Sequence, residues 1–192
     1  MNNITAQSSP AELSAEAQAI IDDVQKSFGN LSAAQLNWQL NADQWSVGQC
    51  LEHLWLINED YFPTFNQLVS GAKTTSFWER LPVLPNLFGK LLISVLAGKG
   101  KYKSIQKFAP AMSKLDNQIL NRFIEQQQRL IKVIAATKSL PLAQTIITSV
   151  VSKHVTYSLQ DAYVIILRHE RRHLAQALRV IQTPGFPQKE LP

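Results

Sequence analysis

The sequence predicts an all-α protein folded as a four-helix bundle. Two observations support this fold class: four long stretches repeat apolar residues at helical spacing, and each stretch follows a helix-start pattern. No segment shows strong strand-type alternation. The chain has 192 residues and is 45% hydrophobic, which suits one domain with a substantial core. We therefore expect a single domain over residues 1–192, with the bundle in 9–182 and a tail in 183–192.

The first two helices are marked at both ends. Ser9 is an N-cap followed by proline at the first helical position, and Gly29 ends this helix. After a turn region, Ser46 opens a second capping box, and its helix extends to Gly71. Pro63 falls inside this second helix, where the missing N–H should kink or interrupt it.

The last two helices show similar signals. The third is predicted to start at Ser113 and to stop before Pro141, and the fourth to start at Ser158 and to end before Pro184. Between them, residues 144–157 are rich in valine, isoleucine and threonine. This stretch is the part of the chain for which the all-α prediction has least support.

A long crossover, residues 72–112, joins the second helix to the third, and residues 85–97 within it could add a short helix. Basic residues concentrate here: residues 73–114 hold eight lysines and arginines and one glutamate, while the whole chain carries a net charge of +5. Because the charge is local, and no helix-turn-helix or zinc-finger pattern accompanies it, we expect no nucleic-acid partner. A solvated loop is the simpler interpretation of this segment.

Composition also bounds the class of protein. Cys50 is the single cysteine, so the chain has neither an internal disulfide nor a cysteine-rich zinc finger. The N-terminus lacks the basic start and apolar core of a secretory signal. The longest apolar stretch, residues 91–97, is far shorter than the roughly 20 residues of a membrane span. A cytoplasmic location is expected.

A pair of histidines marks the fourth helix. His169 and His173 are four residues apart, so their imidazoles share one helical face and could bind one metal ion. With Glu170 they match the His-Glu-x-x-His pattern of zinc proteases, but no third ligand follows downstream. A solvated histidine pair is the alternative. A third ligand must come from upstream, where His53 is the candidate, although a lone histidine on an apolar face is usually a core residue.

Taken together, the order and spacing of these motifs resemble the DinB/YfiT-like superfamily of four-helix proteins with a three-histidine metal site. The match covers approximately residues 9–181, and the crossover and Pro63 depart from the family pattern. The matching residues are Trp45, Ser46 and His53 in the first motif, and His169, His173 and Gln176 in the second.

The resemblance implies that His53, His169 and His173 hold a divalent metal ion. Three neutral imidazoles leave at least one coordination position open, as in catalytic rather than structural zinc sites. Imidazole also suits nickel and iron, so the ion is expected to be zinc, nickel or iron. Neither motif supplies a serine or cysteine with an adjacent base, so the reacting group is expected to be a water or thiol at the metal.

Four further residues are candidates for a place at or near this triad. Gln176 continues the histidine face by one turn and could orient a ligand or substrate. Cys50 could reach the ion as a thiolate, although a buried core residue is the simpler interpretation. His154, before the fourth helix, is expected near the site or at the surface. Glu170 points about 100° away from His169 and is expected to be solvated or paired with arginine.

The predicted function is that of a metal-dependent transferase using a low-molecular-weight thiol as cofactor, because the resemblance implies that activity. Two alternatives stay open. One is a metal-dependent hydrolase, and the other is a non-catalytic module in which the metal staples two helices or the bundle dimerises. The expected partner is a small-molecule substrate, with a second copy of the chain as a candidate.

Overall fold

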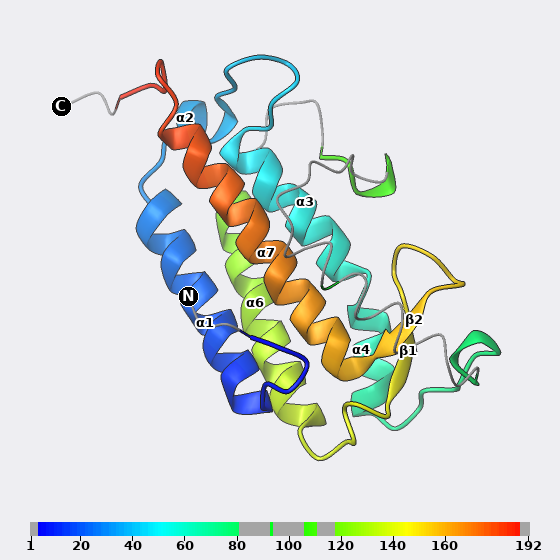
Figure 1. Ribbon diagram of the computed structural model, residues 1–192. Coiled ribbons are helices and arrows are strands. Elements are labelled where there is room, and N and C mark those ends of the chain that lie inside the picture. The colour runs from blue at the N-terminus through cyan, green and yellow to red at the C-terminus, as the bar shows by residue number, and fades with distance from the viewer. Residues whose placement is uncertain (1–3, 81–92, 94–105, 111–117, 189–192) are drawn as a thin grey trace.

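A computed structural model describes residues 4–80, 93, 106–110 and 118–188 of the chain. The four long helices α1, α3, α6 and α7 form a bundle, which confirms the predicted fold class (Figure 1). The elements in chain order are α1 (Pro10–Phe28), α2 (Ala33–Asn37), α3 (Val47–Glu59), α4 (Phe62–Val69), the 3-10 turns η1 (Trp78–Arg80) and η2 (Gln106–Phe108), α6 (Gln118–Thr137), β1 (Ile146–Thr148), β2 (Thr156–Ser158) and α7 (Leu159–Ile181).

The helix directions explain why the second connection is long. α1 and α3 each pack against both α6 and α7. In Figure 1, α1 and α7 run upward while α3 and α6 both run downward. Because α3 and α6 are parallel neighbours, the chain must return along the length of the bundle between them. The length of the crossover therefore follows from the topology.

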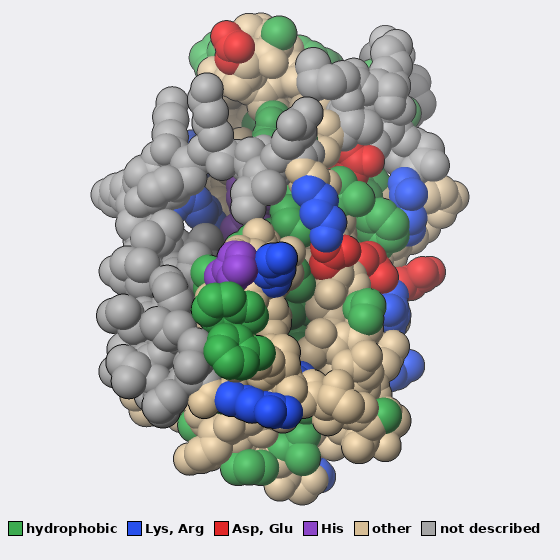
Figure 2. Space-filling model, turned by 90° about the vertical axis from the view of Figure 1, so that its right-hand side faces the viewer, with side chains coloured by type: hydrophobic (Ala, Val, Ile, Leu, Met, Phe, Trp, Pro, Cys, Tyr) green, Lys and Arg blue, Asp and Glu red, His purple; other side chains and the backbone are tan. Residues whose placement is uncertain are grey.

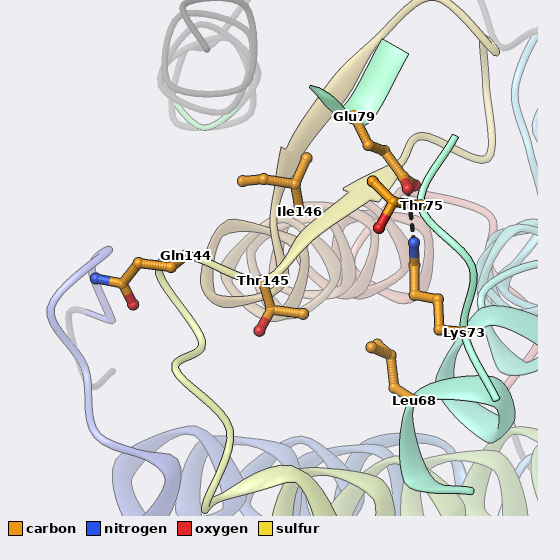
Figure 3. Close-up of a pocket in the computed structure, with 7 residues that line it drawn as sticks. All are labelled: Leu68, Lys73, Thr75, Glu79, Gln144, Thr145 and Ile146. Carbon is orange, nitrogen blue, oxygen red and sulfur yellow. Dashed lines mark hydrogen bonds and ion pairs between the residues drawn. The ribbon is translucent and has the colours of Figure 1, made fainter. Parts of the chain in front are cut away.

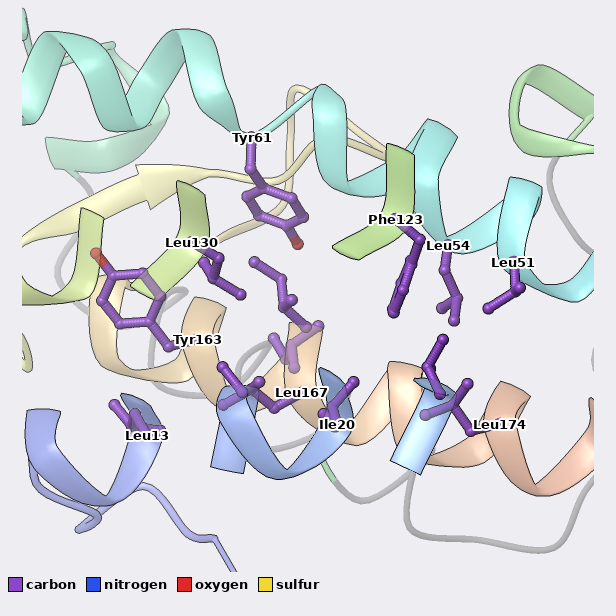
Figure 4. Close-up of a cluster of buried hydrophobic side chains, with 14 of the residues drawn as sticks. Leu13, Ile20, Leu51, Leu54, Tyr61, Phe123, Leu130, Tyr163, Leu167 and Leu174 are labelled. Atoms are coloured by element: carbon purple, nitrogen blue, oxygen red, sulfur yellow. The ribbon is translucent and has the colours of Figure 1, made fainter. Parts of the chain in front are cut away.

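The core lies between all four long helices (Figure 4). Each fully buried leucine or aromatic side chain stabilises the folded state by about 1.5–3 kcal/mol relative to exposure. The helical spacing read from the sequence is the spacing of these inward-facing residues. They include Leu13, Ile20, Leu51, Leu54, Phe123, Tyr163, Leu167 and Leu174.

Three of the predicted helix starts are confirmed. The hydroxyls of Ser9, Ser46 and Ser158 each accept a hydrogen bond from the backbone N–H three residues later. Each bond satisfies one of the free N–H groups at a helix start and is worth about 1 kcal/mol. The predicted start at Ser113 lies outside the described residues, as does the short helix at 85–97 apart from Ile93, which is helical.

The predicted second helix is interrupted, as Pro63 indicated: α3 ends at Glu59, and Pro63 lies in the first turn of α4, where a missing N–H costs nothing. The structure differs from the all-α prediction in the connection between α6 and α7. The segment rich in β-branched residues forms an antiparallel hairpin in which Ile147 of β1 pairs with Tyr157 of β2. The protein is thus a helical bundle with one small hairpin.

None of the described helices combines the length and apolar character that crossing a bilayer requires.

Candidate metal centre

The structure brings the three predicted histidines together at the contact between α3 and α7. His53 lies in the middle of α3, and His169 and His173 lie one turn apart on α7. Their ring centroids are 5.1 Å apart for His53 and His169, 4.7 Å for His53 and His173, and 4.6 Å for His169 and His173. One nitrogen from each ring lies within 4.8 Å of the other two.

The hydrogen bonds of His53 determine its tautomer. Its Nδ1 lies 2.6 Å from the carbonyl oxygen of Phe108 in η2. Because a carbonyl oxygen can only accept, Nδ1 carries the proton and Nε2 presents its lone pair. Nε2 of His53 lies 3.3 Å from Nε2 of His169. Two nitrogens bound at 2.0–2.1 Å to one tetrahedral ion are separated by about 3.3 Å, so this pair has the spacing of metal ligands.

Burial keeps all three imidazoles neutral, as metal binding requires. It lowers the pKa of His53, although the hydrogen bond to Phe108 acts in the opposite direction. The pKa of His169 falls well below its usual value because of burial and of the neighbouring His173 and His53. Burial, followed by the charge of His53, lowers the pKa of His173 to about 3. Nδ1 of His173 is also buried without a hydrogen-bond partner among the described residues. His173 therefore has a neutral ring with an unpaired nitrogen, and it lies beside two other neutral imidazoles. This arrangement fits a metal ion.

The sequence matches the family model of the DinB superfamily over residues 16–177, which include all three histidines. The chain belongs to the DinB superfamily. Its structure is similar to that of YfiT from Bacillus subtilis, with a TM-score of 0.57 and 12% identity over 97% of this chain and 93% of that chain. YfiT is described as a probable metal-dependent hydrolase with an unusual four-helix bundle topology. At this identity the similarity concerns the fold. No curated protein matches the sequence.

Trp45 forms an aromatic wall beside the histidines of this DinB-superfamily chain. Its ring stacks on His173 with centroids 5.6 Å apart and an interplanar angle of 22°. It also lies 5.0 Å from the ring of His53. Trp45 directly precedes Ser46, the N-cap of α3, so the residue before the helix also contacts a histidine of that helix.

The other predicted residues lie in different places. Cys50 is fully buried in the core, and burial raises the pKa of its thiol to about 12. His154 is exposed in the loop between β1 and β2 and contacts Trp78, with ring centroids 4.7 Å apart. Figure 2 shows one face of the molecule, on which an exposed histidine side chain lies beside hydrophobic side chains. Gln176 is half-buried one turn beyond His173, and its side chain raises the pKa of that ring.

Glu170 is the functional-site neighbour that the sequence prediction placed wrongly. It is completely buried rather than solvated or paired with arginine. Its Oε1 accepts hydrogen bonds from Nδ2 of Asn58 at 2.7 Å and Nε2 of Gln127 at 2.5 Å. Burial raises the pKa of its carboxyl group to about 8. One sequence signal was available: Glu170 lies between Leu167 and Leu174 in the apolar spacing of α7.

A separate cavity of about 280 Å³ lies beside the hairpin and α4 (Figure 3). Its wall carries an ion pair in which Nζ of Lys73 lies 2.7 Å from Oε2 of Glu79. The two charges compensate each other, and the cavity contains none of the three histidines. The lining residues are Leu68, Lys73, Thr75, Glu79, Gln144, Thr145 and Ile146.

Proposed function

We propose that this chain is a metal-dependent hydrolase that acts on a small molecule, with a divalent cation bound by His53, His169 and His173. The observation that carries the proposal is the spacing of 3.3 Å between two neutral Nε2 atoms, with the third ring beside them. The description of YfiT, a protein of similar fold, as a probable metal-dependent hydrolase supports the reaction class.

Bound at three imidazoles, zinc, nickel or iron would supply a Lewis acid that lowers the pKa of a water or thiol and polarises an electrophile. The protein contributes orientation and shielding. The carbonyl of Phe108 holds His53 in the Nδ1-protonated tautomer, which directs Nε2 toward His169. Trp45 covers the rings of His53 and His173 on one side and excludes water there.

The charges around the triad favour an anionic substrate. Arg172 and Arg179 lie on the same helix as the histidine pair, three and ten residues after His169. After burial and the charge of His53, their positive charges contribute to the low pKa of His173. A positive potential at the site raises the local concentration of molecules that carry a carboxylate or phosphate. We therefore expect an ester or amide substrate with such a group.

Thiol transfer is the second candidate reaction, since a positive potential also favours a thiolate. The nucleophile would then be a diffusible low-molecular-weight thiol, because the buried Cys50 keeps its proton with a pKa of about 12. A third candidate is a non-catalytic role, in which the metal staples α3 to α7 or the bundle pairs with a second copy.

One comparison of rates tests these candidates. Metal-loaded protein, metal-free protein and the His53→Ala variant are assayed with anionic esters and amides, and then with an electrophile and several thiols. His154→Ala, which changes an exposed histidine outside the triad, is the matched control. Hydrolysis that needs both metal and His53 supports the hydrolase. Thiol conjugation with the same requirements would replace it with the transferase. Equal rates for all proteins in both assays would leave only the non-catalytic role.

A further inference from the structure

A buried polar cluster joins the two helices that carry the histidines. Glu170 follows His169 on α7, and Asn58 lies five residues after His53 on α3. Asn58 and Gln127 of α6 both donate to the same carboxylate oxygen of Glu170, over 2.7 and 2.5 Å. All three side chains are at least 96% buried, so water does not compete for these bonds. The cluster thus connects α3, α6 and α7 beside the triad.

This cluster is costly for the stability of the fold. Oε2 of Glu170, Oδ1 of Asn58 and Oε1 of Gln127 are buried without partners among the described residues. Each unsatisfied buried polar group destabilises the folded state, because it has lost its hydrogen bonds to water without gaining others. Apolar side chains of the same size are often as stable or more stable at such positions. Stability therefore does not account for the cluster, whereas directional hydrogen bonds can select one arrangement of packed helices.

The hydrogen bonds of the cluster can select one rotation of α7 about its own axis. Side-chain ends lie about 5–6 Å from a helix axis, so a rotation of 10° displaces them by about 1 Å. Metal–ligand distances tolerate only about 0.2 Å. Apolar contacts are not directional enough to define a helix rotation to that tolerance. Glu170 is 100° around the helix from His169, so fixing Glu170 against α3 and α6 also fixes the direction of His169.

We propose that Glu170 is a positioning residue for the metal centre, setting the rotation of α7 at which His169 faces His53 through its bonds to Asn58 and Gln127. The inference rests on the proposed metal site of the preceding section. The buried glutamate sets the geometry of the metal ligands, and it acts neither as a ligand nor as a base. Substitution of Glu170 should alter metal affinity and coordination geometry in a protein that still folds.

Cobalt(II) titration, followed by visible absorption, measures both affinity and coordination geometry. Glu170→Gln keeps a carbonyl oxygen that can accept from Asn58 and Gln127, and should bind cobalt within about threefold of the wild type. Glu170→Met has similar size but no acceptor. It should lose about 10–100-fold in affinity, the usual effect of removing a group that orients metal ligands, with an altered cobalt spectrum. The matched control is Thr137→Val, which removes the buried hydrogen bond from α6 to Tyr163 of α7 and should bind cobalt normally.

A second variant separates positioning from folding. Asn58→Leu, Gln127→Met and Glu170→Met together remove the cluster without leaving a stranded polar group. This triple variant should unfold at or above the wild-type temperature and still show weakened cobalt binding with an altered spectrum. Wild-type affinity and spectrum in the folded triple variant would overturn the inference, as would its failure to fold, which would assign the cluster to the fold. Absence of cobalt binding by the wild type would instead overturn the metal centre itself.

Discussion

Nδ1 of His53 donates to the carbonyl oxygen of Phe108 over 2.6 Å, although the two residues lie 55 positions apart. The contact joins α3 to η2, and an ion pair between Lys107 and Asp60 holds the same two elements together. Because the carbonyl accepts the proton of Nδ1, the Nε2 lone pair of His53 faces His169. The end of the crossover thereby sets the tautomer of the histidine that α3 contributes to the triad.

Metal content should depend on the triad alone. We expect about one divalent ion per chain, and loss of the ion in His53→Ala and in His169→Ala, because two imidazoles hold a divalent ion far less tightly than three. Elemental analysis of purified protein measures the ratio, with His154→Ala as the control that keeps its metal. Stoichiometric metal in the His169→Ala, His173→Ala double variant would contradict the site.

Metal affinity should decrease with acidity only below the ordinary histidine pKa of 6.5. Protons compete with the metal for imidazole, so affinity falls as the pH drops through the pKa values of the folded protein. Burial lowers all three values, to about 3 for His173. Calorimetric titrations with zinc at a series of pH values measure the dependence. A steep loss centred near pH 6.5 would show that the rings titrate as exposed histidines.

Metal binding should be visible in the fluorescence of Trp45. Its ring lies 5.0 Å from His53 and 5.6 Å from His173, close enough for bound nickel to quench its emission. Trp45→Phe should therefore remove most of the quenching while the protein still binds nickel. The control is Trp78→Phe, since Trp78 contacts the exposed His154 rather than the triad. Quenching that persists in Trp45→Phe and disappears in Trp78→Phe would place the metal elsewhere.

Cys50 should be inert in the folded protein. Its side chain is completely buried, and its pKa of about 12 leaves almost no thiolate at neutral pH. A chromogenic disulfide reagent should release almost no colour from native protein and about one equivalent in guanidinium chloride, since the chain has one cysteine. Rapid reaction of the native protein would revive Cys50 as a nucleophile or ligand.

Glu79 should stabilise the fold in a pH-dependent way. Burial alone would raise its pKa, but hydrogen bonds from Lys73, Ser76 and Thr148 outweigh burial and lower it below 4.5. The unfolded state thus binds the proton more tightly, so the stabilisation is present above pH 4.5 and is lost as the pH falls below it. Glu79→Gln should cost about 1 kcal/mol at neutral pH, and less in acid. Urea unfolding at both pH values measures this, with exposed Glu125→Gln as the control.

The sequence alone predicted the long helices and the histidine pair of α7. Serine caps, terminating glycines and apolar spacing act within a few residues, so three starts and the paired face of His169 and His173 could be read directly. His53 was identified by resemblance to the superfamily, because nothing local distinguishes it from an ordinary buried histidine. Pro63 in the sequence also predicted that the helix would be kinked or interrupted, and the chain is interrupted after α3.

Only the tertiary structure decided which groups surround the three histidines. The carbonyl of Phe108 and the side chain of Gln127 reach the site from distant parts of the chain, and no local pattern encodes such contacts. Glu170 was expected in solvent because charged side chains usually remain there. It is buried because α3 and α6 pack over its face of α7 and supply two amide donors. The burial of Glu170 and the raised pKa that results from it are properties of the packed helices. They arise only once the bundle has formed.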